Sequence, residues 1–192
     1  MNLIINLNKI NFVKYLLIYF IIMLITNYYR ISNIIDHLLR SNVSVSMTSV
    51  YISSVFTSIF IVLVFPLVIL ICFYLREIFF STLKIESIFS ATRQAVVIFI
   101  VFELVRFLSI ELILIDEIHK IRSFDNFINK LNETLWFRYN LMINFVSIII
   151  GAYVFGIKLY DQEEKIIPSI VFSIIFIIIF YTASPESFSW LY

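Results

Sequence analysis

The amino-acid sequence predicts an all-α, polytopic membrane bundle with about five transmembrane helices and one interfacial amphipathic helix. Hydrophobic residues make up 61% of the chain, compared with about 45–50% in soluble domains. The apolar stretches are continuous, and their lengths are close to the roughly 20 residues that a helix needs to cross a bilayer. Only helices and closed barrels satisfy their backbone hydrogen bonds in lipid, and barrel strands are about half as long, so helices are expected.

Composition and charge exclude several classes of protein. The 192 residues are enough for one compact domain. The net charge is +1 and the basic residues are scattered, so no nucleic-acid partner is expected. The single cysteine, Cys72, lies in an apolar stretch, which excludes an intrachain disulfide and a thiolate zinc site. No HExxH, GxSxG or Walker pattern occurs, so we expect no catalytic activity; an intramembrane transferase or hydrolase is an alternative without positive support.

The expected spans follow one another with short polar connections, at about residues 12–29, 50–75, 95–115, 141–160 and 166–181. Lys9 and Lys14 precede the first span, and no small-residue cleavage site follows it. We therefore interpret it as a retained span rather than a cleaved signal peptide. Pro66 lies inside the second span, where it removes one backbone donor and is expected to kink the helix. The third span carries three charges, and without it the count is four.

Both glycines of the chain lie in the fourth span. Gly151 and Gly156 are five residues apart, whereas the close-packing GxxxG motif has a spacing of four. Because a glycine has no side chain, each one still narrows the helix locally. We therefore expect a neighbouring helix to approach the fourth span at these positions.

The polar segment at about residues 117–136 predicts an amphipathic helix that lies along the membrane surface or packs on a partner. Trp136 closes the segment, at a depth that Trp prefers in membrane proteins. Apolar residues recur every three or four positions and would form one face of this helix: Ile118, Ile121, Phe124, Ile128, Leu131 and Leu135. The alternative is an irregular soluble loop.

Glu103 and Arg106 lie near the middle of the third span. A charge at this depth is costly, so it usually faces the interior of a bundle or a cavity. The spacing of three residues places both side chains on one face of a helix, where they can pair. The functional interpretation is a pathway for protons, ions or a substrate. The structural interpretation, which is the one we expect, is an ion pair that fixes helix packing or recruits a partner helix.

The histidines are the remaining candidate ligands. His37 and His119 fall in the first and third connections, which share a side of the membrane in the five-span arrangement. Asp36, Asp116 and Glu117 lie beside them and could complete a metal site. However, the spacing matches no known metal-binding pattern. We therefore expect neither a metal ion nor another cofactor.

Residues 84–108, KIESIFSATRQAVVIFIVFELVRFL, place a basic, Phe-containing loop before a span that bears Glu103. This pattern, together with about five closely spaced spans and no large soluble domain, resembles bacterial members of the Yip1-like superfamily of small membrane proteins. The resemblance covers about residues 50–183. It implies a five-helix membrane fold and supplies no catalytic residues; in eukaryotic relatives it implies membrane-trafficking partners.

Two functional hypotheses follow. The first is an accessory or partner-binding subunit of a larger membrane assembly, whose partners are the lipid bilayer and other membrane-protein subunits. The alternative is a small transporter or channel component that uses Glu103 and Arg106, although no inverted repeat of a complete secondary transporter is visible. The expected location is a bacterial inner membrane, and an organelle inner membrane is the alternative.

Overall fold

The computed structural model describes residues 2–40, 47–121, 130 and 132–183, and within these ranges it contains helices and no strand. This confirms the all-α bundle that the sequence predicts. The elements are α1 (Asn2–Arg40), α2 (Met47–Phe79), α3 (Ile85–Ser109), the π-helical turn η1 (Ile110–Leu114), α4 (Ile115–Lys120), α6 (Leu135–Glu163) and α7 (Ile166–Ala183).

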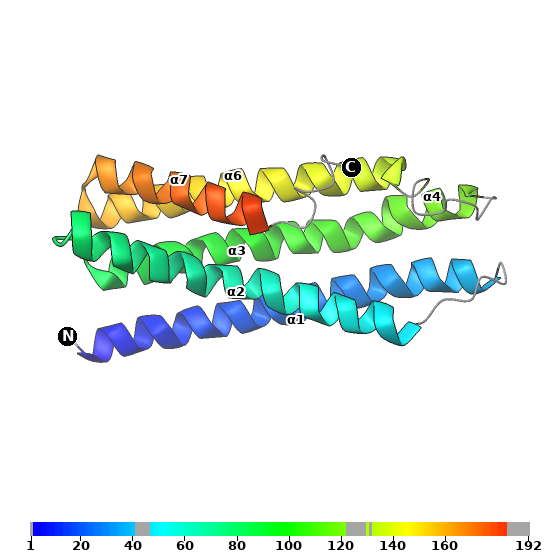
Figure 1. Ribbon diagram of the computed structural model, residues 1–192, viewed down its shortest axis with the longest axis horizontal. Helices are drawn as coiled ribbons and strands as arrows, with labels where there is room; N and C mark the ends of the chain where they lie inside the picture. The colour runs from blue at the N-terminus through cyan, green and yellow to red at the C-terminus, as the bar shows by residue number, and fades with distance from the viewer. Residues whose placement is uncertain (1, 41–46, 122–129, 131, 184–192) are drawn as a thin grey trace.

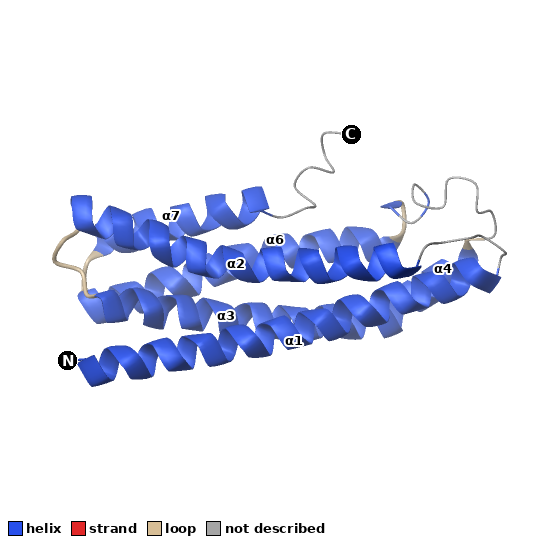
Figure 2. Cartoon of the chain, turned by 60° about the horizontal axis from the view of Figure 1, so that its bottom comes forward, coloured by secondary structure: helices blue, strands red, loops and turns tan. Residues whose placement is uncertain are grey.

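The long helices lie side by side along one axis, and the chain reverses direction at each end of the bundle (Figures 1 and 2). One end, which we call the N-terminal end, holds the start of α1 and the turns that join α2 to α3 and α6 to α7. The other end, which we call the α4 end, holds the ends of α1 and α4. The last helix, α7, starts at the N-terminal end and stops partway along the bundle, beside α2 and α6.

Among the described residues, four segments are long and apolar enough to cross a membrane, namely Asn11–His37, Ser54–Phe79, Leu135–Glu163 and Ile166–Ala183. This composition is that of an integral membrane protein. The charged helix α3 does not qualify by composition, but it runs alongside the other four through the bundle (Figure 1). Because α3 packs most extensively on α6 and α1, much of its surface is turned away from lipid. A helix shielded in this way can carry polar residues where a lipid-facing helix cannot.

An aromatic cluster forms the centre of the core. The rings of Phe65, Phe99 and Phe176 surround Phe180, with centroids 4.7, 4.8 and 4.5 Å from the Phe180 ring. Tyr19 of α1 adds an edge-to-face contact with Phe65 at 5.8 Å. These geometries are the ones that aromatic pairs prefer. The cluster therefore joins α1, α2, α3 and α7 at one level of the bundle.

Both glycines of α6 mark close helix contacts, which confirms the sequence-based expectation. A Cβ built on Gly151 would lie 2.7 Å from Cε2 of Phe99 on α3. A Cβ built on Gly156 would overlap Oγ of Ser173 on α7. Each glycine thus admits a side chain from a different neighbour, and α6 is packed between α3 and α7.

Side chains of α6 hold the N-terminal end of α3. The Glu163 carboxylate accepts a hydrogen bond from the backbone N–H of Lys84, at 3.1 Å, and another from the hydroxyl of Ser87. Gln162 also donates to the Ser90 hydroxyl at 3.2 Å. A carboxylate at a helix N-terminus satisfies unpaired N–H groups and complements the positive end of the helix dipole. This contact fixes where α3 begins.

The prediction of one amphipathic helix over residues 117–136 is wrong. The helix that includes Ile118 ends at Lys120, and Ile121 has an extended backbone. A new helix starts at Leu135, where the Thr134 hydroxyl accepts a hydrogen bond from the N–H of Phe137 at 3.2 Å. Of the expected apolar face, Phe124, Ile128 and Leu131 lie outside the described residues.

The apolar residues at both ends of that segment have a different role from the predicted one. Ile118 and Trp136 are buried, and they form a second core at the α4 end together with Ile110 and Leu114. They are apolar because they pack against each other within the chain. Their apolar character therefore reflects an internal contact between η1, α4 and α6. Leu135, in contrast, is exposed.

Candidate functional site

The charged residues of α3 form an ion pair inside the bundle. Arg106 Nη1 donates to Glu103 Oε2 across 2.9 Å, as the three-residue spacing predicts. Glu103 is 2% exposed, and a carboxylate at such a position requires a charged or hydrogen-bonding partner. Only one of its two oxygens obtains one: Oε1 is buried and has no hydrogen-bond partner among the described residues.

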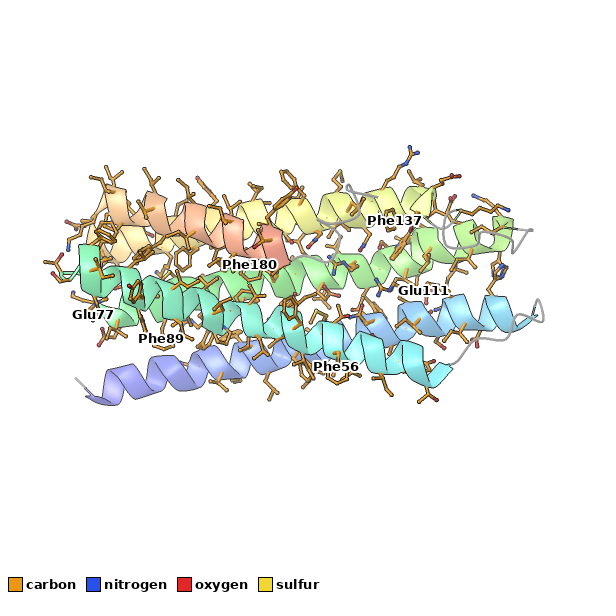
Figure 3. All side chains as sticks on the ribbon, in the orientation of Figure 1. Phe56, Glu77, Phe89, Glu111, Phe137 and Phe180 are labelled. Atoms are coloured by element: carbon orange, nitrogen blue, oxygen red, sulfur yellow. The ribbon has the colours of Figure 1, made fainter. Side chains whose placement is uncertain are left out.

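The pair borders a chamber of about 350 Å³ between α1, α2, α3, α6 and α7. This volume is within the range of small-molecule sites, about 300–1,000 Å³. Its further polar lining comes from three other helices and consists of Asn27, Arg30, Thr57, Asn144 and Ser147. Its aromatic lining consists of Tyr19, Phe99, Phe102, Phe137 and Phe180, and Figure 3 labels the last two, on α6 and α7.

The polar residues that line the chamber have the same spacing in three of the helices. In α1, α3 and α6 the chamber is lined by two polar residues three positions apart: Asn27 and Arg30, Glu103 and Arg106, and Asn144 and Ser147. This spacing places both members of a pair on one helix face. Helix packing brings the three faces to the same level of the bundle, so that polar groups meet in the interior and the outside stays apolar. Side chains on the flanks of the bundle are accordingly mainly carbon (Figure 3).

The π-helical turn η1 lies directly beyond the ion pair. Ser109 connects the two: its hydroxyl donates to the carbonyl of Arg106 at 2.6 Å and accepts the indole N–H of Trp136 at 3.2 Å. Two residues later Glu111 of η1 faces α1 (Figure 3), where its carboxylate accepts a hydrogen bond from the Tyr29 hydroxyl. Single π-turns within α-helices are frequent beside functional sites, and this one begins four residues after Arg106.

The two histidines lie together at the α4 end, in agreement with the prediction that both are on the same side of the membrane. The ring centroids of His37 and His119 are 5.5 Å apart, and Nε2 of His37 lies 3.4 Å from the carbonyl oxygen of Ile121. The pocket beside them, with Asn33 and Asp36, has a volume of only about 90 Å³. The described ranges contain no group of three or more His, Cys, Asp or Glu side chains that could hold a metal ion.

No protein-family model matches this chain, and neither a curated protein nor a solved structure matches it. The resemblance to Yip1-like proteins therefore stays a prediction. Sequence reasoning identified Glu103 and Arg106 and missed the lining residues of α1 and α6. The signal that could have found them is the repeated pair of polar residues, three positions apart, within otherwise apolar spans.

Proposed function

We propose that the protein is a small membrane-embedded transport component that binds a polar solute in the chamber beside Glu103 and Arg106. One observation carries the proposal: a buried carboxylate oxygen, Glu103 Oε1, that has no hydrogen-bond partner in the part of the chain that the structure describes, at the wall of a chamber of about 350 Å³. An ion pair that served packing alone would be expected to have both oxygens satisfied by tightly packed neighbours. Here polar groups and open space are kept together at a depth where both are costly.

Two helices that line the chamber carry points at which they can bend. Pro66 lies inside α2, two residues from Val64, which lines the chamber. Since proline lacks a backbone N–H, one hydrogen bond of the α2 ladder is missing there. The π-turn η1 interrupts the regular ladder just after α3. Such irregularities are the usual places of helix bending, and bending here would change access to the chamber.

The hypothesis of an accessory subunit has less support. Its expected partner-binding face included Ile118 and Trp136, and both are buried inside this chain. Association with other membrane proteins stays a prediction, and recovery of stoichiometric partner chains after purification in a mild detergent would favour it. The chamber, by contrast, is lined by described residues of a single chain.

The proposal is tested by solute entry into liposomes that contain the purified protein. Light scattering follows the swelling of these liposomes in isosmotic solutions of small anions, cations, zwitterions and neutral polyols. We expect faster swelling than in protein-free liposomes for at least one class, and loss of that effect in Glu103→Gln. The matched control is Glu77→Gln, because this glutamate is exposed at the N-terminal end of the bundle (Figure 3). Equal swelling with and without protein for every class would contradict the proposal.

A further inference from the structure

The side of the bundle formed by α6 and α7 carries a groove that the proposed function does not use. The groove has a volume of about 500 Å³ and is lined by side chains of α6, between Ile149 and Tyr160, and of α7, between Ile166 and Ile177. The two helices lie side by side (Figure 1), and both are long and apolar enough to span a membrane. We propose that this groove binds one acyl chain of a phospholipid from the surrounding bilayer.

Small residues form the floor of the groove, and large apolar residues form its walls. The floor lies where α6 and α7 come close together, since a Cβ built on Gly156 would overlap the Ser173 hydroxyl. The floor residues are Ala152, Gly156, Ser169 and Ser173. Four wall residues are between 41% and 65% exposed, namely Tyr153, Ile157, Ile170 and Ile174. The difference in side-chain size between floor and walls gives the groove its depth.

The hydroxyls on the floor are already used within α7. The Ser169 hydroxyl donates to the carbonyl of Lys165, and the Ser173 hydroxyl donates to the carbonyl of Ser169, each at 2.8 Å. The surface that faces the groove is therefore almost entirely carbon. A polar solute would lose its hydrogen bonds to water on entering such a groove, which is costly. The lining thus favours a hydrocarbon chain.

The surroundings of the groove supply such a chain. Because α6 and α7 are membrane-spanning segments, the exposed walls of the groove face the hydrocarbon of the bilayer. The groove is continuous with this lipid-facing surface, so lipid chains are the molecules next to it. A chain in the groove contacts protein on the floor and on two walls, whereas a chain on the convex flank of a helix contacts protein on one side. The additional van der Waals contacts favour the groove.

The length of the groove matches one leaflet of the bilayer. Ile149 and Tyr160 are eleven positions apart on α6, and Ile166 and Ile177 are eleven positions apart on α7. At a rise of 1.5 Å per residue, both helices give a groove about 16 Å long. Half of the hydrocarbon core is about 15 Å thick. The groove therefore accommodates one chain that enters at the turn between α6 and α7 and ends near the centre of the bilayer.

The charges at that turn do not select one headgroup. Glu163, at the end of α6, is engaged with the start of α3 through Lys84 and Ser87. The other charged residues between positions 158 and 165 comprise two bases and two acids: Lys158, Lys165, Asp161 and Glu164. This stretch has no excess of positive charge that would favour an anionic lipid. We therefore expect the acyl chain, and not the headgroup, to determine binding.

Photo-crosslinking of the full chain in phosphatidylcholine liposomes tests the site. A small share of the lipid carries a diazirine at the end of one acyl chain. The sample is diluted into a mild detergent, which removes loosely held lipid, and is then irradiated. Peptide mass spectrometry locates the label. We expect about tenfold more label at Ile149 and Ile177, the inner end of the groove, than at Leu70, which is 63% exposed on α2.

Two variants of α7 assign the retained label to the groove. Ile170→Trp enlarges one wall, and because Ile170 is 54% exposed, the larger side chain can turn into the groove without disturbing the core. Its label at the inner end should fall to the level at Leu70. Ile167→Trp is the matched control, because Ile167 is 69% exposed on the same helix and lies outside the lining of the groove. This control should retain the label.

The remaining outcomes count against the proposal. Equal loss of label from the groove and from Leu70 would overturn it. Stronger labelling by phosphatidylglycerol with the same diazirine chain would overturn selection by the chain. Crosslinks between two copies, formed from a photoreactive residue in place of Ile170, would assign the groove to a second copy of this chain and overturn the proposal. Solute entry into liposomes tests the chamber separately.

Discussion

Replacing Gly151 by alanine tests the packing that supports the chamber. The added Cβ would lie 2.7 Å from Cε2 and 3.3 Å from Cδ2 of Phe99. Carbon atoms in contact are ordinarily about 3.5–4.0 Å apart. The ring would therefore have to retreat by roughly 1 Å, because the Cβ position is fixed by the backbone of α6.

The surroundings of Phe99 determine the size of the effect. This ring is buried, 5.2 Å from the centroid of Phe65 and 4.8 Å from that of Phe180, so it has little room to move within the cluster. Overpacking of a dense core costs about 1–3 kcal/mol. Alanine has a higher helix propensity than glycine, which stabilises the folded state by about 1 kcal/mol and offsets part of this cost. The difference is about 0–2 kcal/mol, and because the ring has little room to move we expect Gly151→Ala to lower the free energy of unfolding by an amount in the upper half of that range.

The assay is reversible unfolding in mixed micelles by titration with a denaturing detergent, followed by circular dichroism. A double-mutant cycle isolates the contact: in a Phe99→Leu background the obstacle is smaller, and Gly151→Ala should be neutral or stabilising. The same energetic effect of Gly151→Ala in both backgrounds would refute the packing described here. Gly156→Ala is a useful comparison, because the added Cβ would overlap only the Ser173 hydroxyl. This hydroxyl can rotate away if it gives up its 2.8 Å hydrogen bond to the carbonyl of Ser169.

Three further predictions follow from the polar contacts. Arg106→Met should destabilise the protein by about 3 kcal/mol in the same unfolding assay, because it leaves a buried carboxylate without its cation, and adding Glu103→Gln should recover most of that loss. Glu163→Gln should cost about 1 kcal/mol in that assay, since the N-terminus of α3 loses a charged cap. The hydrogen bond from Lys120 lowers the pKa of the Glu117 carboxyl. The stability that this hydrogen bond supplies is present above the ordinary pKa of glutamate and is lost as pH falls through the lowered pKa of Glu117. In Lys120→Met, NMR titration should show that the pKa of Glu117 rises.

The fold class was predictable because few backbone structures can satisfy their hydrogen bonds within a bilayer. Continuous apolar stretches of sufficient length are compatible only with helices. The ends of the helices were less predictable, because apolarity marks the part of a helix that meets lipid and not the whole helix. The third span was expected to begin at about residue 95, whereas α3 begins at Ile85. Its extra turns depend on the cap from Glu163, a contact between segments far apart in the sequence.

The site was predictable only within one helix. The pairing of Glu103 with Arg106 follows from their spacing, because both lie on the same turn of α3. The chamber depends in addition on the register between helices, which sets Asn27 and Asn144 at the level of that pair. A pattern within one helix can mark its polar face, as the paired polar residues of α1 and α6 do, but it does not encode the register between helices. The same limitation applies to Ile118: its spacing predicts a face toward the membrane surface or a partner, whereas the residues it contacts lie elsewhere in the fold.

Thiol labelling at two positions of α6 tests the central claim most directly, namely that a polar chamber lies inside a membrane-spanning bundle. In a Cys72→Ala background, Asn144→Cys places a thiol in the chamber, and Tyr153→Cys places one on the outer face, where the tyrosine is 65% exposed. Thiols react as thiolates, which form in water and not in lipid. A water-soluble methanethiosulfonate should therefore modify Asn144→Cys and spare Tyr153→Cys in liposomes. Faster modification of the outer position would contradict the account.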